Sequence, residues 1–107
     1  NDLKFFPNWF QQVEMESNGK SLDALGKELE LPAAPLVFGE IGTESQHSFF
    51  QLLHQGTANV AADIIVSKED SGSLAYAQAI TQAKLLSNRH IGDEMGQTPV
   101  NLFLLNK

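Results

Sequence analysis

Two histidines, His47 and His54, lie seven positions apart in the segment GTESQHSFFQLLHQGT at residues 42–57, which we predict to be helical. Zinc ligands on one helix lie three or four positions apart, because both imidazoles must reach the metal at about 2 Å. At a rise of about 1.5 Å per residue, rings seven positions apart start roughly 10 Å from one another. The spacing therefore excludes a metal ion shared by these histidines.

The predicted helix has a recognisable start. Thr43 and Gln46 have the spacing of a capping box, so we expect a helix from about residue 44 to 55 that ends at Gly56. His47 then lies in the first turn, where the positive end of the helix dipole disfavours an imidazolium. A neutral imidazole that can exchange protons is suited to acid–base chemistry.

A helical wheel separates the side chains of this segment into two faces. Phe49 and Leu53 belong to an apolar face, whereas His47, Phe50 and His54 lie on the opposite one. A surface position is the usual explanation for a histidine on a polar face. Phe50 does not fit a purely solvated face, however, and this indicates an interface.

A second candidate lies in the segment QQVEMESNGKS. Pro7 suits the first turn of a helix and Asn18-Gly19 suits its end, so Glu16 falls in the last turn. There its carboxylate meets the negative end of the dipole, which favours proton uptake by a general base. Gln12, one turn earlier on the same face, could bind a substrate hydroxyl. A solvated glutamate at a helix end is the simpler alternative.

The tripeptide Gly-Lys-Ser at residues 19–21 resembles the end of a phosphate-binding P-loop. That motif needs a glycine five positions before Gly19, where this chain has Glu14, and it follows a strand rather than a helix. Without a glycine-rich loop the lysine has no phosphate to reach. We therefore exclude a nucleotide site of this type.

Composition restricts the class of protein. Thirteen acidic against seven basic residues give a net charge of −6, which argues against nucleic acid or an anionic membrane as a partner. The absence of cysteine excludes disulfides and thiolate metal sites. Apolar runs are too short to span a bilayer, and the first residues lack the features of a signal peptide. The start without methionine, inside apparently structured sequence, suggests a fragment.

The order of predicted elements indicates an α/β fold. Apolar runs at residues 36–38, 60–66 and 100–105 are typical of buried strands, and Ser73 can cap a helix between the last two. Residues 88–99 form a predicted loop. The preceding stretch, KSLDALGKELELPAAP, fits either a short helix or a hairpin that turns at Gly26. Strands alternating with helices predict a short parallel sheet covered by helices.

Three stretches in this chain resemble the glucose-6-phosphate isomerase family. Residues 11–21 are similar to its QQxxMESNGK-like helix end, and residues 39–57 are similar to its GExGTNxQHxFxQLxHQGT-like segment. GQTPVN at 96–101 is similar to a GNRPxN-like stretch that precedes a strand. Order and spacing of the motifs also match.

The resemblance implies roles for particular residues. Glu16 matches the catalytic base, which moves a proton between C1 and C2 of the sugar phosphate through a cis-enediol(ate). Gln12 matches a substrate-contacting glutamine, and His47 matches the histidine that assists ring opening across the dimer interface. Phe50 fits such an interface, and His54 matches a histidine to which we assign no chemical role.

The resemblance also implies a fold, a metabolic role, a cellular location and an oligomeric state. The family has two sugar isomerase (SIS) domains, each a three-layer sandwich of a parallel sheet between helices. Residues 1–107 look like a single partial domain, part of the second one. The reaction belongs to glycolysis and gluconeogenesis, needs no metal or organic cofactor, and implies a cytoplasmic homodimer.

The chain departs from the family pattern at several points. Glu44-Ser45 replace the usual Asn-Gly, and Gln97-Thr98 replace Asn-Arg. The phosphate-binding loop, an arginine near the reacting carbons, and a C-terminal glutamine and lysine have no counterpart here. Without them substrate is poorly oriented, so we expect the chain alone to be inactive.

Two other interpretations remain open at this point. The substitutions leave room for a non-catalytic SIS module that binds a sugar phosphate or mediates dimerisation. The chain could also be a truncated α/β piece without activity.

Overall fold

A computed structural model describes residues 3–88 and 98–106 of the 107-residue chain. The chain divides into two compact units, Asn1–Ile41 and Gly42–Lys107. Most of the loop predicted at residues 88–99 lies outside the described residues.

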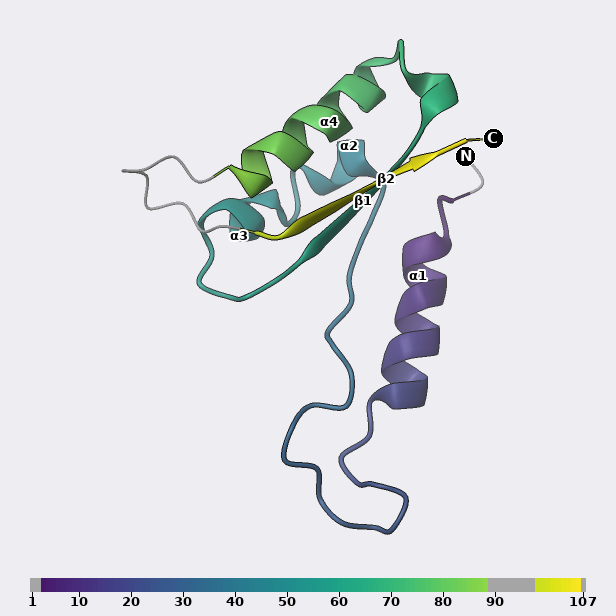
Figure 1. Ribbon diagram of the computed structural model, residues 1–107, viewed down its shortest axis with the longest axis vertical. Coiled ribbons are helices and arrows are strands. Elements are labelled where there is room, and N and C mark those ends of the chain that lie inside the picture. Colours follow the sequence, from purple (N-terminus) through teal and green to yellow (C-terminus); the bar gives the residue numbers. More distant parts are fainter. Residues whose placement is uncertain (1–2, 89–97, 107) are drawn as a thin grey trace. The chain divides into compact units, whose positions relative to one another are not determined.

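The first unit begins with a helix that Figure 1 shows as one continuous coil, although its hydrogen-bonding period changes along its length. Helix α1 (Phe6–Gln11) has a proline in its first turn, as predicted, and continues as the π-helical segment η1 (Gln12–Glu16). Helical backbone extends to residue 18. The helix therefore ends at Asn18-Gly19, which confirms the position of the predicted stop. The left-handed backbone expected of such a stop is wrong, because neither residue has a positive φ.

Gly19 is required at this helix end by close approach of the backbone. Its N–H donates to the carbonyl oxygen of Met15 at 3.1 Å. A Cβ atom at this position would overlap that same oxygen. A side chain here would displace the last turn, so the chain can leave the helix at this angle only with glycine.

The stretch after the helix forms a tight antiparallel turn. Leu22 pairs with Glu28, and the Asp23 carboxylate accepts hydrogen bonds from the N–H groups of Leu25 and Lys27, at 2.8 and 2.9 Å. Gly26 has a φ of 81°, which favours glycine. Of the two alternatives that periodicity left open, the structure has the hairpin.

The strand predicted at residues 36–38 is wrong. The structure describes these residues but assigns them no strand, and Leu36 is 83% exposed. The Val37 N–H donates to Sδ of Met15 at 3.5 Å rather than to a ladder. A short apolar run becomes a strand only beside another strand, and the described part of this unit supplies no such partner.

The second unit contains the parallel sheet. Strand β1 (Ala62–Ser67) pairs with β2 (Val100–Leu105) in a parallel register that runs from Ala62↔Val100 to Ser67↔Leu105. Both were predicted within two residues. Between them lie the 3-10 turn η2 (Lys68–Asp70) and helix α4 (Leu74–Ser87). The Ser73 hydroxyl accepts from the Tyr76 N–H at 3.1 Å, which confirms Ser73 as the helix cap.

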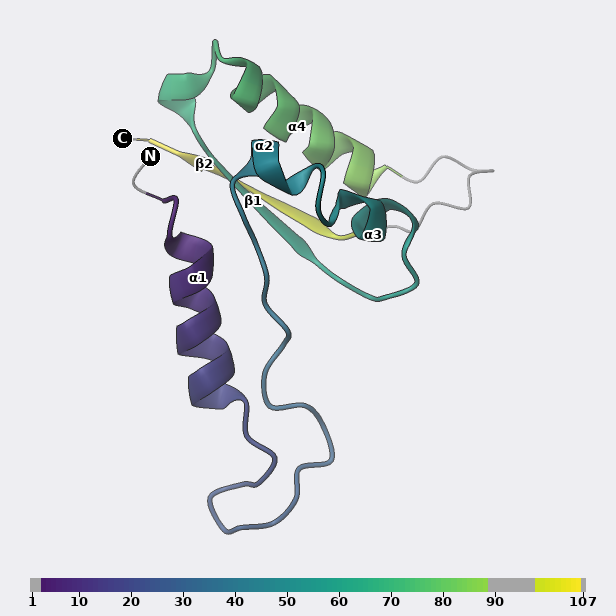
Figure 2. The ribbon, with the colours of Figure 1, turned by 180° about the vertical axis from the view of Figure 1, so that it is seen from behind.

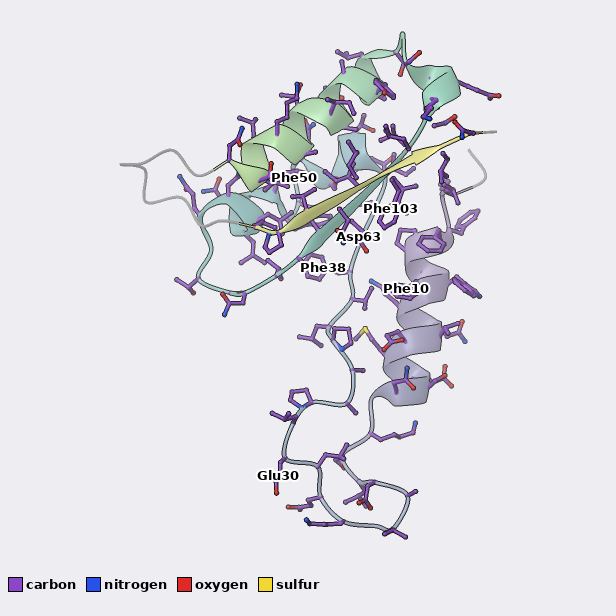
Figure 3. The ribbon with its side chains drawn as sticks, in the orientation of Figure 1. Phe10, Glu30, Phe38, Phe50, Asp63 and Phe103 are labelled. Atoms are coloured by element: carbon purple, nitrogen blue, oxygen red, sulfur yellow. The ribbon has the colours of Figure 1, made fainter. Side chains whose placement is uncertain are left out.

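Helix α4 covers one face of the sheet, and the core forms there (Figures 1 and 2). Leu86 of α4, 2% exposed, and Val66 of β1 are buried. On the other face the cross-strand partners Ile65 and Phe103 are 37% and 46% exposed. Asp63 lies on that face too (Figure 3), and its carboxylate accepts from the Asn101 amide at 2.8 Å. The predicted α/β class, a short parallel sheet with helices, is confirmed.

The continuous helix predicted from about residue 44 to 55 is wrong. Two short helices take its place, α2 (Gly42–Ser45) and α3 (Phe50–Gln55), with turns at 46–49. Because α2 already begins at Gly42, the predicted capping box does not start the helix. The hydroxyls of Ser45 and Ser48 donate to the carbonyls of Gly42 and Ser45, at 2.9 and 3.1 Å. Serine side chains that bind nearby backbone in this way compete with helix propagation.

None of the helices in the described ranges has the length and apolar character needed to cross a bilayer.

Candidate active site

Gln12 and Glu16 occupy the two ends of the π-helical segment η1, and both are exposed. Side chains four positions apart on a helix lie on one face. Their predicted placement, on one face of a helix close to its end, is therefore confirmed. Short π-helical segments within α-helices are frequent at functional sites.

The helix end around Glu16 is held by polar side chains. The Asn18 amide donates to the Glu14 carboxylate at 3.1 Å, and Lys20 Nζ donates to the main-chain oxygen of Glu16 at 2.7 Å. From the sequence, Lys20 was considered only as part of the rejected P-loop, so its contact with the Glu16 main chain was not predicted. Its position four residues after Glu16, beyond a helix stop, was the available signal.

His47 lies in the turn between α2 and α3 and is exposed. The main-chain N–H of His47 donates to the main-chain oxygen of Glu44, with an N···O distance of 3.4 Å. The prediction that His47 belongs to the first turn of a long helix is wrong. The helical wheel that put His47 and His54 together on one face of that helix is wrong for the same reason. His47 therefore does not lie in a first helical turn, where the helix dipole was expected to keep its imidazole neutral.

The substitution of serine at position 45 is accommodated by the fold. Ser45 is 2% exposed, and its hydroxyl donates to Gly42 inside α2. Within the described residues no buried side-chain nitrogen or oxygen is left without a hydrogen bond. Glu44, the other departure in this segment, is exposed.

His54 has a packing environment that differs from that of His47. It is half-buried; its Nε2 lies 3.3 Å from Oε1 of Gln82 on α4, and its ring centroid lies 6.1 Å from that of Phe50. An amide oxygen can only accept a hydrogen bond, so this contact suits the imidazole tautomer with a proton on Nε2. His54 therefore links α3 to α4.

The candidate residues are divided between the two units: Gln12 and Glu16 lie in the first, His47 in the second. Open hollows of about 250 and 590 Å³ lie among the described residues of the second unit. His47 lines neither of them. Within residues 3–88 and 98–106, no three His, Asp or Glu side chains gather closely enough to hold a metal ion.

Comparison with known proteins shows to which protein family the chain belongs. The structure is similar to a crystal structure of a glucose-6-phosphate isomerase from Chlamydia trachomatis, with a TM-score of 0.76 over 97% of this chain and 31% identity. Residues 1–96 match the family model described as phosphoglucose isomerase. The chain belongs to the phosphoglucose isomerase family.

Two curated relatives agree with this assignment. The glucose-6-phosphate isomerase of Acinetobacter baumannii is 40% identical over 89 residues, which is 83% of this chain and 16% of that protein. The one from Chlorobium luteolum is 57% identical over 64 residues, which is 60% of this chain and 12% of that protein. The chain likewise covers 23% of the Chlamydia structure. It thus spans less than a quarter of each of these relatives.

Proposed function

We propose that this chain contributes the catalytic base to a glucose-6-phosphate isomerase, which interconverts glucose 6-phosphate and fructose 6-phosphate. One observation carries the proposal: Gln12 and Glu16 share one exposed face of a helix end in a chain of the phosphoglucose isomerase family. This arrangement supports a carboxylate that reaches the substrate while the glutamine binds it. The sugar phosphate is the proposed substrate.

In the proposed reaction the Glu16 carboxylate removes the proton from C2 of the open-chain aldose. The electron pair of the broken C–H bond forms the C1–C2 double bond of a cis-enediol(ate). As this double bond forms, the electron pair of the C1 carbonyl moves onto O1, which takes the hydroxyl proton of O2. The C2=O bond then forms from O2, and the electron pair of the C1–C2 double bond takes the proton back from Glu16 at C1. The reverse direction uses the same steps, so one group is base and acid in turn.

His47 is proposed to assist ring opening before this transfer, by moving a proton between the ring oxygen and the C1 hydroxyl. Its exposed position in the turn between α2 and α3 supports contact with a substrate or with a second subunit. We further propose that both units belong to the second SIS domain of a cytoplasmic homodimer that acts in glycolysis and gluconeogenesis. The chain alone should be inactive, because phosphate anchoring must come from other residues.

A chimera tests the proposal. The matching segment of the Chlamydia trachomatis isomerase is replaced by this chain, and turnover of fructose 6-phosphate is followed by a coupled assay. We expect activity, and we expect Glu16→Gln to lower kcat by about a hundredfold or more, since glutamine keeps the shape but cannot accept the proton. A folded chimera that binds sugar phosphate without turnover would instead favour a non-catalytic binding module.

A further inference from the structure

The end of the first helix has an unusual way of satisfying its last carbonyl groups. A helix leaves about four carbonyl oxygens without an intrahelical donor. Here the Met15 oxygen accepts from the Gly19 N–H at 3.1 Å, and the Asn18 oxygen accepts from the Lys20 N–H at 2.7 Å. The Glu16 oxygen accepts from the side chain of Lys20, also at 2.7 Å. Lys20 therefore serves this helix end twice, by main chain and side chain.

We propose that Lys20 is a positioning residue for Glu16, an inference that rests on the function proposed above. Its ammonium binds the main-chain oxygen of the residue whose side chain moves the proton. The contact also puts a positive charge at the negative end of the helix, where a cation stabilises the last turn. Helix ends fray when their carbonyl groups lack donors. The last turn is the one that carries Glu16.

Gly19 makes this contact sterically feasible. Because a Cβ atom at position 19 would overlap the Met15 oxygen, only glycine allows the chain to turn this closely past the helix. That turn brings Lys20 back over the carbonyl oxygen four residues before it. The Gly19-Lys20 pair of the tripeptide that resembles a P-loop is thereby explained by its contacts at the helix end.

The positioning role predicts a specific kinetic effect. When Lys20 is lost, the backbone at Glu16 becomes mobile and its carboxylate spends less time in line with the substrate C–H bond. Substrate binding depends mainly on phosphate contacts made elsewhere, so kcat should fall while KM changes little. If Lys20 were only an exposed side chain without this role, its loss would change neither kcat nor KM.

The contact itself is tested in the 107-residue chain by amide hydrogen exchange measured by NMR. Lys20→Met removes the ammonium, Lys20→Arg retains a donor and a charge, and Lys27→Met is a matched control at another exposed lysine of the same unit. We expect the Gly19 amide to exchange about two- to fivefold faster in Lys20→Met, and at the original rate in the other two. Unchanged exchange in Lys20→Met overturns the proposal.

The role in the reaction is tested in the chimera. Lys20→Met should lower kcat by about ten- to a hundredfold with KM within about twofold, and Lys20→Arg should recover most of the loss. A full kcat in Lys20→Met, a loss confined to KM, or an arginine variant as poor as methionine overturns the positioning role. If the unsubstituted chimera folds but is inactive, the proposed function fails. Faster exchange in Lys20→Met would then still establish the helix-end contact.

Discussion

The hydroxyl of Thr98 donates to the main-chain oxygen of Leu53 at 2.7 Å, across 45 positions of sequence. Thr98 is 4% exposed, and its own N–H donates to the Leu86 oxygen at 3.3 Å. Thr98, two residues before β2, thus binds the ends of both α3 and α4. Thr98 stands where the family pattern has arginine. The buried hydrogen bond to Leu53 is made by the threonine hydroxyl, which an arginine does not have.

Replacing Thr98 by valine should destabilise the second unit. Valine has nearly the same shape but no donor, so the buried Leu53 oxygen loses its partner. The expected loss is about 1–3 kcal/mol in the free energy of unfolding, measured by urea denaturation. Thr98→Ser keeps the hydroxyl and should retain most of the stability. Equal stability of the valine variant and the original chain would contradict the role of this bond.

The contact between His54 and Gln82 predicts different outcomes for two histidine replacements. The amide nitrogen of glutamine can occupy the position of Nε2, whereas the shorter asparagine cannot reach Gln82. His54→Gln should therefore keep most of the stability, and His54→Asn should lose about 0.5–1.5 kcal/mol. Gln82→Leu should cost a similar amount, and combining it with His54→Asn should add little. Additive losses in the double variant would show that the two residues act separately.

Gly19 should not tolerate even a methyl group. In Gly19→Ala the Cβ atom meets the Met15 oxygen, so the last helical turn must open. We expect a loss of about 0.5–3 kcal/mol of local stability, seen as faster amide exchange over residues 12–18. Gly72→Ala is the matched control, because a Cβ atom there meets nothing within 4 Å. Similar exchange rates for the two variants would argue against the steric explanation.

The role proposed for His47 can be separated from that of Glu16 by the choice of substrate. In the chimera, His47→Leu should slow the turnover of ring-forming glucose 6-phosphate by about a hundredfold or more. An analogue without the 5-hydroxyl cannot close the same ring, so its turnover should be largely unaffected. Equal losses on both substrates would place His47 in the proton transfer itself.

The sequence predicted the elements whose signals are local and unopposed. Ser73 caps α4 through its own hydroxyl, and the apolar runs of β1 and β2 appear where they were expected. The placement of Gln12 and Glu16 near a helix end followed from Pro7 and Asn18-Gly19. The matched motifs alone were enough to indicate the family.

Tertiary structure decided the features that depend on competing partners. Helical periodicity from Gly42 to Gln55 is real, but the hydroxyls of Ser45 and Ser48 bind backbone carbonyls and divide the segment. A helical wheel assumes that the backbone continues, so it misplaced His47. Residues 36–38 are apolar enough for a strand yet form none, because strand formation needs a neighbour that sequence alone does not reveal.

Sequence by itself therefore determined the family through its motifs, and the helix end that carries Glu16 through residues close along the chain. It also predicted the parallel sheet from the order of strands and helices, although β1 and β2 pair residues far apart in sequence. Only the tertiary structure showed that His54 links two helices, that Thr98 joins α3 to the segment before β2, and that the Lys20 ammonium binds the Glu16 carbonyl. These contacts depend on the direction of individual side chains, which residue type and spacing do not set.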